Sequence, residues 1–271
     1  MSIELFSPPA LRVRRFGRVN WVGLAALYRR QVARALKDTI DGLLGPVMTN
    51  LLFLAVFRLS LGPSEWPMAE IPLMSFVAPA LVLFAVAERA LTATSAAILF
   101  DKQVGAMVDL TMAPLTSWER VVGQAAGAAT AGLMTGGAVA IVLLPIAGVV
   151  PASPLTALFF AAAIALLFGL LGIAVGLWST RWDHFTLAHS FLFIPPAYFS
   201  GMFYPVERLP EIGQRLVALN PFFYGLDGFR RGVTGWGEAE PLFAAGLLLA
   251  LILATAFAVR LLVRSGYRVK A

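Results

Sequence analysis

The longest uncharged apolar stretches of this chain are long enough to cross a lipid bilayer. Residues 154–178 and 241–259 contain no charged side chain, and about 20 apolar residues in a helix span roughly 30 Å of hydrocarbon. Of the 271 residues, 59% are hydrophobic and 13% are charged, whereas an average soluble domain carries about 25% charged residues. A soluble core cannot enclose this much apolar surface, so we expect an all-α integral membrane protein.

Four further stretches are apolar enough to be spans, although each is interrupted or flanked by polar residues. They are residues 39–61, 71–100, 121–150 and 184–204. Glu88 and Arg89 interrupt the second of these four, and Pro195 and Pro196 break the last. The sequence therefore predicts six transmembrane helices.

Lysine and arginine are concentrated near one set of span ends, and such residues favour the cytoplasmic side of a membrane. With six spans, that side collects Arg12, Arg14, Arg15, Arg18, Arg29, Arg30, Arg34, Lys37, Lys102, Arg120, Arg181, Arg260, Arg264, Arg268 and Lys270. The opposite side holds Arg58 at a span end and, in one long loop, Arg208, Arg215, Arg230 and Arg231. This asymmetry predicts that both termini are cytoplasmic. An odd number of spans would separate the two terminal basic clusters.

Residues 21–37 have the pattern of an amphipathic helix. The apolar positions share one helical face and are Trp21, Leu24, Tyr28, Val32 and Leu36. The basic residues lie mostly off that face and are Arg29, Arg30, Arg34 and Lys37. Such a helix is expected to lie in the headgroup plane, with its cations on anionic lipid. A simple topology anchor and a contact with a partner both remain open.

The second predicted span is longer than a bilayer requires. Residues 73–100 as one helix would reach about 42 Å, so we expect this helix to project beyond the hydrocarbon. Glu88 and Arg89 then lie near or just inside the inner interface. Ionisable groups at that depth are often functional, but an interfacial pair that only extends its charges towards water fits equally.

The loop after this span, residues 101–114, is predicted to contain a short helix. Val104, Met107, Val108 and Thr111 share one face of it, and Pro114 ends it. Ser117 is in position to cap the helix that follows. An apolar face in a cytoplasmic loop has to be covered, either by a soluble partner or by the headgroup layer.

The outer loop, residues 205–237, contains two apolar pieces that are too short to span. Pro210 begins the first, whose apolar face is formed by Ile212, Leu216 and Leu219. Asn220 and Pro221 end it, and the second piece covers residues 222–229. The pair predicts a re-entrant hairpin between spans five and six, with two helices lying flat on the surface as the alternative.

Glycine pairs at four-residue spacing occur in the third and fourth predicted spans. They are Gly123 with Gly127, Gly132 with Gly136, and Gly172 with Gly176. Small residues let helices approach closely. Packing within the chain is the expected use.

Residues that could carry catalysis or bind a cofactor are scarce. The chain has no cysteine and only two histidines, His184 and His189, and the dipeptide Gly-Lys of a nucleotide-binding loop does not occur. We therefore predict no enzyme activity, cofactor or metal on this chain. The net charge of +6 is concentrated at span ends, so nucleic acid is not an expected partner.

Five short strings connect these features to a known family. They are Tyr198-Phe199-Ser200-Gly201-Met202-Phe203-Tyr204-Pro205, Leu209-Pro210, Leu219-Asn220-Pro221, Gly228-Phe229-Arg230-Arg231-Gly232 and Val108-Asp109-Leu110-Thr111-Met112-Ala113-Pro114-Leu115. Through the order and spacing of these strings along the chain, the sequence resembles the ABC-2 type permeases, specifically the short single-domain YadH-like and NodJ-like subunits. The resemblance covers nearly the full length of the chain.

The resemblance implies an organisation and a set of partners. Residues 1–38 would be a cytoplasmic tail and elbow helix, 39–264 the ABC-2 transmembrane domain and 265–271 a cytoplasmic tail. The permease would form a dimer in the bacterial inner membrane, surrounded by lipid, and bind a separate cytoplasmic ABC ATPase that carries ATP and Mg²⁺. Nothing in the sequence distinguishes a homodimer from a heterodimer.

The resemblance also assigns roles to particular residues. The ATPase-coupling loop would contain Val104, Gly105, Met107, Val108, Leu110 and Pro114. The outer gate hairpin would contain Pro210, Asn220, Pro221, Gly228 and Arg230. Glu88 and Arg89 are candidate pathway residues, although they depart from the uncharged polar residues expected there.

The resemblance implies the permease subunit of an ATP-driven exporter for a polysaccharide, a lipid-linked compound or a drug-like compound. The alternative is an ion-coupled secondary transporter that uses Asp41, Glu88 or His189. No inverted repeat, which is common in such transporters, is visible in the sequence. A membrane enzyme acting on lipid-linked sugars would need clustered acids, bases or metal ligands, and the polar residues are too scattered for that.

Overall fold

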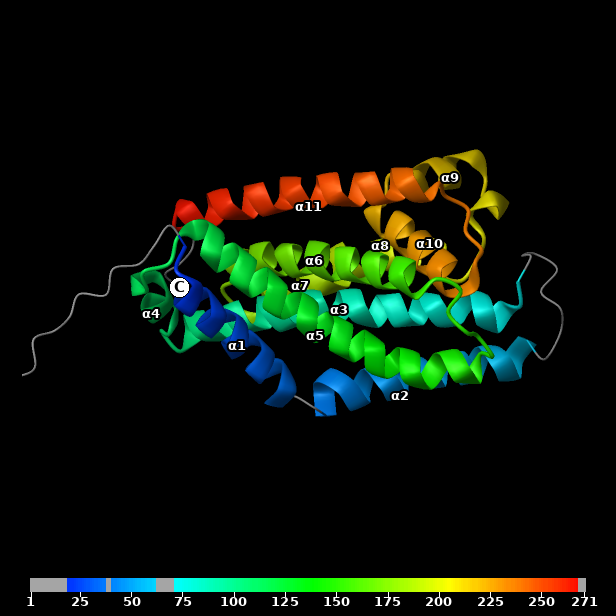
Figure 1. Ribbon diagram of the computed structural model, residues 1–271, viewed down its shortest axis with the longest axis horizontal. Coiled ribbons are helices and arrows are strands. Elements are labelled where there is room, and N and C mark those ends of the chain that lie inside the picture. Colours follow the sequence, from blue (N-terminus) through cyan, green and yellow to red (C-terminus); the bar gives the residue numbers. More distant parts are fainter. Residues whose placement is uncertain (1–18, 38–39, 62–70, 268–271) are drawn as a thin grey trace, which may run out of the picture.

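A computed structural model describes residues 19–37, 40–61 and 71–267, and the regular structure in these ranges is helical (Figure 1). The helices are α1 (Trp21–Lys37), the π-helical turn η1 (Ile40–Leu44), α2 (Gly45–Leu61), α3 (Leu73–Gln103), α4 (Met107–Met112), α5 (Ser117–Ile146), α6 (Pro154–Trp178), α7 (Trp182–Ala188), the π-helical turn η2 (His189–Phe193), α8 (Ile194–Tyr198), the 3₁₀ turn η3 (Val206–Arg208), α9 (Glu211–Ala218), α10 (Pro221–Thr234) and α11 (Pro241–Arg264). The basic residues Arg12, Arg14, Arg15, Arg18, Arg268 and Lys270 lie outside these ranges.

Five helices in the described ranges are long and apolar enough to cross a bilayer. They cover Gly42–Ser60, Leu73–Gln103, Ser117–Ile146, Pro154–Trp178 and Pro241–Arg264. Their positions match five of the six stretches that the sequence predicts as spans. The sixth stretch, residues 184–204, is not a single long helix but the broken run α7–η2–α8, which ends at Tyr198. Pro195 and Pro196 both lie in α8, at the end of that run.

The long helices run along the longest axis of the molecule, and α1 crosses them obliquely (Figure 1). The short helix α4 lies at one end of the bundle, together with the beginning of α1 and the end of α11. We call this the α4 end. The opposite end, which we call the α9 end, holds α9 and the connections from α5 to α6 and from α10 to α11. The first and last described residues therefore lie at the same end of the bundle.

The centre of the bundle is α3, whose apolar window is 72% buried. Its neighbours α5 and α6 approach it through glycines. A Cβ atom on Gly132 would lie 2.6 Å from the carbonyl oxygen of Val86, and one on Gly172 would lie 2.6 Å from that of Leu91. The expected packing role of these glycines within the chain is confirmed.

The helix α10 packs antiparallel along the part of α6 nearest the α9 end. Three glycines of α10 lie directly against residues of α6. The pairs are Gly225 with Ile164, Gly228 with Phe160, and Gly232 with Ala157. At the start of α10, Phe222 packs edge-on against Phe168 of α6, at a ring distance of 5.6 Å. Phe168 is 14 residues after the start of α6, so α10 reaches about 21 Å along that helix.

The helices α2 and α11 are the most exposed of the five long helices, since only 17% of the apolar window of each is buried. Leu52, Val56 and Leu59 of α2 project outwards, as do Leu249 and Leu253 of α11. Large exposed apolar surfaces on long helices have to be covered by lipid or by another protein. Either environment agrees with an integral membrane protein.

Candidate functional site

The loop that joins α3 to α5 presents a small apolar surface at the α4 end. Gly105 adopts a positive φ of 75°, which glycine tolerates because it has no Cβ. This turn separates α3 from α4 and exposes Val104, Val108 and Met112, whose exposed fractions are 57%, 49% and 79%. We call these three side chains the α4 patch.

The structure corrects the face that the sequence predicts for this loop. Met107 and Leu110 point inwards and join a buried cluster with Leu27 and Val121. The prediction treated residues 104–111 as one continuous helix, but the turn at Gly105 changes the direction of the chain before α4 begins. Met107 therefore does not share an exposed face with Val104 and Val108.

Hydrogen bonds fix this loop to its neighbours on both sides. Lys102, only 5% exposed, donates from Nζ to the carbonyl oxygens of Leu177 and Ser179 at 2.5 and 3.1 Å. On the other side, Asn20 Nδ2 donates to the carbonyl oxygen of Pro114 at 3.1 Å. Arg120 donates to the carbonyl oxygen of Thr111 at 2.9 Å. The loop is thus tied to α6, to α5 and to the residue that precedes α1.

The helix after the loop is capped by Thr116 and not, as predicted, by Ser117. Thr116 and Glu119 form a reciprocal capping box, in which each side chain accepts a hydrogen bond from the other residue's backbone. The Glu119 carboxylate also accepts a hydrogen bond from the backbone N–H of Asn20 at 2.5 Å. Ser117 fails as the cap because it is already the first helical residue.

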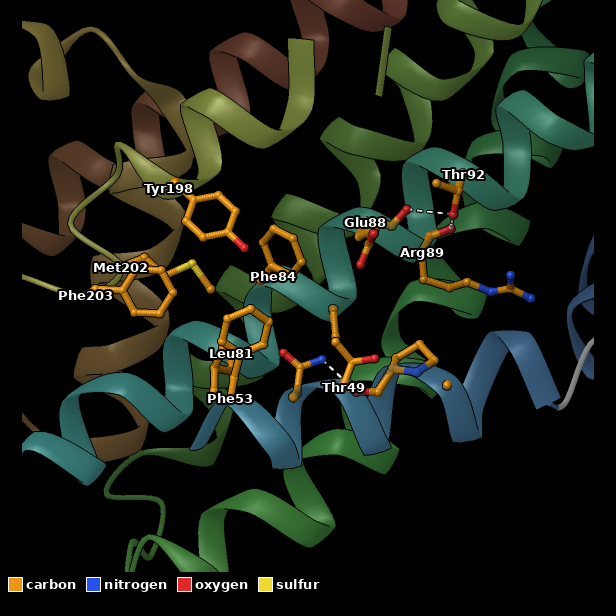
Figure 2. Close-up of a pocket in the computed structure, with 14 residues that line it drawn as sticks. Thr49, Phe53, Leu81, Phe84, Glu88, Arg89, Thr92, Tyr198, Met202 and Phe203 are labelled. Atoms are coloured by element: carbon orange, nitrogen blue, oxygen red, sulfur yellow. Dashed lines mark hydrogen bonds between the residues drawn. The ribbon is translucent and has the colours of Figure 1, made fainter. Parts of the chain in front are cut away.

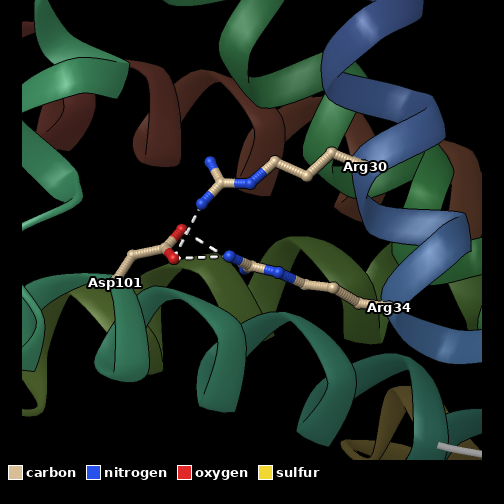
Figure 3. A network of polar contacts seen from close by, with 3 residues as sticks. All are labelled: Arg30, Arg34 and Asp101. Atoms are coloured by element: carbon tan, nitrogen blue, oxygen red, sulfur yellow. Dashed lines mark hydrogen bonds and ion pairs between the residues drawn. The ribbon is translucent and has the colours of Figure 1, made fainter. Parts of the chain in front are cut away.

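An ion-pair cluster connects α1 to the end of α3 (Figure 3). Arg30 and Arg34, one turn apart on α1, both donate to Asp101, at 2.8 and 2.6 Å. The Asp101 side chain is 6% exposed, and the two arginine side chains are 36% and 34% exposed. The amphipathic pattern of residues 21–37 predicted lipid headgroups as the partners of these arginines. The four-residue spacing of Arg30 and Arg34 was the signal that one acidic residue could bind both.

Glu88 and Arg89 border a pocket of about 330 Å³ between α2, α3 and the segment 198–203. Figure 2 shows the Glu88 carboxylate turned towards Phe84 and the interior of the pocket, whereas the Arg89 side chain extends in another direction. Thr49, Phe53 and other side chains of α2 form the opposite wall. The two candidate pathway residues therefore line a real cavity.

Glu88 also contacts the broken run that follows α6. Its Oε1 lies 3.2 Å from Nε2 of His189, and the His189 ring stacks between Phe185 and Phe193. The structure thus brings together two of the three residues named for the ion-coupled alternative. The side chain of the third, Asp41, lies outside the described residues.

At the α9 end, Arg230 is a buried cation with an exposed fraction of 2%. Its guanidinium donates to the carbonyl oxygens of Phe76 and Gly201, at 3.3 and 2.9 Å. It also lies 3.7 Å from the centroid of the Phe76 ring, which is a cation–π contact. Arg230 therefore joins α10 to the start of α3 and to the segment after α8.

Two acidic residues complete this network. Asp227 accepts hydrogen bonds from the backbone N–H groups of Glu238 and Ala239, both at 2.8 Å. Glu238 accepts hydrogen bonds from the backbone N–H of Val206, at 3.1 and 3.2 Å. Burial raises the pKa of Glu238 to about 7, with the nearby Asp227 adding to the effect and the hydrogen bond from Val206 opposing it. Neither acid could be identified from the sequence, because no pattern in the neighbouring residues indicates its partners.

The remaining residues of the predicted outer hairpin have identifiable structural roles. Pro210 directly precedes α9, and Pro221 occupies the first turn of α10. Asn220 caps α10 by accepting a hydrogen bond from the Phe222 N–H, and its Nδ2 donates to the carbonyl oxygen of Pro196 at 2.6 Å. Gly228 has no Cβ, and the Phe160 ring occupies the space that a Cβ would fill. The second helical piece extends to Thr234, beyond the predicted end at residue 229.

Comparison with known proteins shows the family. The sequence model of the ABC-2 type transporter family matches residues 23–233, which include most of α1, the coupling-loop candidates, the Glu88 pocket and nearly all of α10. The chain belongs to the ABC-2 type transporter family. The resemblance inferred from the short strings is confirmed, and ABC-2 permeases are membrane transport components that generally work with an ATPase subunit.

Individual ABC-2 relatives align over most of their length. The chain is 27% identical to the inner membrane transport permease YadH of Escherichia coli (strain K12) over 237 residues, which are 86% of this chain and 91% of YadH. It is 25% identical to nodulation protein J of Rhizobium leguminosarum bv. viciae over 241 residues, covering 87% and 90% of the two chains. For nodulation protein J of Sinorhizobium fredii (strain NBRC 101917 / NGR234), the identity is 26% over 212 residues, covering 78% and 80%.

Proposed function

We propose that this chain is the membrane subunit of an ATP-driven exporter and that the α4 patch is its docking surface for a separate cytoplasmic ATPase. The substrate is a polysaccharide, a lipid-linked compound or a drug-like compound. The observation that carries the proposal is a patch of exposed apolar side chains on a loop that is rigidly fixed to three helices. Val104, Val108 and Met112 are exposed, while Lys102 and Asn20 anchor the loop on either side of them.

Rigid anchoring matters because a contact transmits motion only if it does not deform first. Each hydrogen bond of the loop contributes about 1 kcal/mol, and together they connect it to α1, α5 and α6. A partner that moved the α4 patch would therefore move the ends of several long helices. A short amphipathic helix inserted into a groove is a common recognition mode.

The proposal includes six spans, with both termini in the cytoplasm. In the chain, the run from Trp182 to Tyr198 connects the end of α6 to η3 and α9, and a helix broken by prolines can cross where neighbouring helices satisfy its backbone. The first and last described residues share the α4 end, as an even number of spans requires. The arginine asymmetry favours the cytoplasm for that end.

The outer hairpin of the proposal is formed by α9 and α10. The packing of α10 along about 21 Å of α6 supports a helix that enters the outer leaflet. It argues against two helices lying flat on the surface. The apolar side chains of α9, Ile212, Leu216 and Leu219, are 75%, 53% and 81% exposed, so they are available to lipid or to a second subunit. In this proposal, the hairpin closes the external side of the pathway.

We propose further that two copies of the chain pair in the membrane and that the Glu88 pocket forms part of the pathway. Thr49 and Phe53 of α2 line that pocket, and the same helix exposes Leu52 and Val56, which supports a second subunit next to it. Cysteines introduced at Leu52 and Val56 are expected to crosslink between two chains in native membranes, whereas cysteines at Leu249 and Leu253 of α11 serve as the comparison. Crosslinks from α11 alone would contradict a pathway-side interface.

Crosslinking to the ATPase tests the docking surface directly, because the chain has no natural cysteine. Val108→Cys and Val150→Cys place one thiol each at the α4 end and in the α5–α6 connection at the α9 end. With a co-expressed candidate ABC ATPase, a short bifunctional reagent is expected to trap a complex through residue 108 and not through residue 150. A complex formed equally through residue 150 would contradict the proposed orientation and docking.

The second candidate function, ion-coupled transport, is favoured by the 3.2 Å contact between Glu88 and His189. A proton-coupled transporter would depend on that pair. If ATP drives export, transport into inverted vesicles should continue after a protonophore is added. Glu88→Gln should then change the substrate preference more than the energy coupling. Transport that is abolished by the protonophore but indifferent to ATP would favour the second candidate.

A further inference from the structure

A second cleft, separate from the Glu88 pocket, lies between α1, α3 and α5 and has a volume of about 410 Å³. Its walls include the basic side chains Arg34, Lys37 and Arg89. None of the described residues that line it is acidic. The cleft therefore has the charge to attract an anion.

Between these cations the cleft is lined mainly by small apolar residues. They are Ala35, Ala93, Ala96, Ala97, Gly127, Ala128 and Ala131, and at one edge Phe100 is 51% exposed. Alanine and glycine leave a shallow apolar trough where larger side chains would fill the space. A trough bordered by cations fits a ligand that is anionic at one part and apolar at another.

The contacts that Arg34 makes leave it able to bind such a ligand as well. Arg34 donates two hydrogen bonds to Asp101, but a guanidinium has five N–H donors, so it can bind a phosphate as well. The Glu88 carboxylate lies in the neighbouring pocket and does not line this cleft. Arg89 lines both cavities.

We propose that this cleft is a binding site for an anionic phospholipid of the surrounding bilayer. The phosphate lies between Lys37, Arg34 and Arg89, and the glycerol and first acyl methylenes lie in the alanine trough. A volume of about 410 Å³ equals roughly fourteen water-sized groups, which accommodates a headgroup and the start of a chain. Basic pockets between membrane helices are a recognised setting for such lipids.

The site would make the position of α1 depend on lipid composition, because the lipid contacts both α1 and α3. A basic helix is attracted in general to an anionic surface. This cleft would in addition bind one anionic lipid at a fixed position. The inference does not require an ATPase partner, so it can fail while the proposed transport function stands.

Native mass spectrometry of the full-length protein in a non-ionic detergent tests the site. The probes are dioleoylphosphatidylglycerol, dioleoylphosphatidylcholine and the soluble headgroup sn-glycerol 3-phosphate. The expected result is one tightly bound phosphatidylglycerol per chain, roughly tenfold tighter than phosphatidylcholine. Lys37→Gln should weaken phosphatidylglycerol binding roughly fivefold, since one cation near an anionic lipid contributes about 1 kcal/mol. Lys37→Arg should restore it.

Two further variants separate a defined lipid site from simpler explanations. Ala96→Leu fills the trough without changing charge and should weaken phosphatidylglycerol binding at least fivefold. Arg264→Gln removes an exposed cation of α11 at the same end of the bundle and should change binding less than twofold. Sharp thermal unfolding of each variant in detergent confirms that it is folded.

Three results would overturn the proposal. Equal binding of the two phospholipids would remove the charge argument. An equal loss in Arg264→Gln and Lys37→Gln would show diffuse attraction to the whole basic end. Undiminished phosphatidylglycerol binding in Ala96→Leu, with glycerol phosphate competing at equal concentration, would show a phosphate site without a lipid site.

Discussion

The two ends of the bundle hold their elements together in different ways. At the α9 end, Arg230 is 2% exposed and donates to backbone carbonyls of two separate segments. At the α4 end, Asp101 is held by two arginines that are each about one-third exposed, so water competes for those contacts. A buried charge is stable only with its full set of partners, whereas a half-exposed one can exchange partners at low cost. We infer that the α9 end is a fixed closure. At the α4 end the attachment of α1 to α3 is adjustable, whereas Lys102 holds the loop between α3 and α5 firmly to the end of α6.

The largest expected effect is the loss of Arg230. Arg230→Met removes the cation but leaves Asp227 and two carbonyl groups in a buried site, so we expect destabilisation of about 3–5 kcal/mol. Thermal unfolding in detergent measures it. Arg215→Gln is the control, because the Arg215 side chain is 82% exposed and its loss should cost less than about 0.5 kcal/mol. Equal stability of the two variants would show that Arg230 does not hold the α9 end together.

A matched pair of glycine substitutions compares the ends next. A Cβ on Gly232, at the α9 end, would clash with the backbone nitrogen of Ala157, whereas one on Gly123, near the α4 end, would meet the tip of the Leu27 side chain at 3.0 Å. Backbone cannot move aside as a side chain can. We expect Gly232→Ala to cost about 2 kcal/mol. Gly123→Ala should be close to neutral, because alanine adds about 1 kcal/mol of helix propensity.

Chemical denaturation of the purified protein ranks the two glycine variants. The comparison would fail if Gly123→Ala proved the more damaging of the pair.

A smaller and more local effect is expected from Asp101→Asn. Losing a partly exposed ion pair costs about 1 kcal/mol, which should speed amide hydrogen exchange in α1 roughly fivefold and leave α10 unchanged. Asp183→Asn removes an acid of the same type whose side chain is 80% exposed, and exchange should then stay as in the wild type. Faster exchange throughout the bundle would mean that Asp101 supports the whole fold and not only the attachment of α1.

The smallest expected effect is a pH dependence at the α9 end. The folded pKa of Glu238, about 7, lies above its ordinary value of 4.5, so the folded state binds a proton more tightly than the unfolded state. The contribution of Glu238 to stability is then greatest below pH 4.5 and falls as the pH rises to about 7. Because the group is partly exposed, the change is about 1 kcal/mol. Glu238→Gln should flatten the pH dependence of the unfolding temperature between pH 5 and 7.5.

Much of the fold could be predicted from the sequence because bilayer thickness requires long apolar helices. The α6 prediction, residues 154–178, agrees with the structure at both ends. The broken run at Trp182–Tyr198 was harder to predict, because prolines permit either a kinked span or its end. The end of α10 was also missed. Two adjacent arginines, Arg230 and Arg231, follow the apolar piece 222–229 and suggest that the helix ends there. Carbonyl oxygens distant in sequence allow Arg230 to be buried instead.

The candidate site was predicted less completely than the fold. The local sequence pattern located the short helix between α3 and α5 but not its exposed face, because the turn at Gly105 depends on a positive φ. Partners distant in sequence were invisible. Asp101 binds arginines 71 and 67 residues earlier, and Lys102 binds carbonyls 75 and 77 residues later. Such pairs are selected by the packing of the helices and leave no local signal.

The measurement that tests the account most directly is ATP hydrolysis by a candidate partner ABC ATPase, reconstituted with this chain in lipid nanodiscs. The comparison is between the wild type, Val104→Asp with Val108→Asp, and Val150→Asp, which carries the same kind of change at the α9 end. Burying an unpaired carboxylate costs several kcal/mol, so the double variant should lose at least tenfold in ATPase binding and in permease-dependent turnover, while Val150→Asp keeps both. Wild-type binding and turnover in the double variant would contradict the assignment of the α4 patch as the coupling surface.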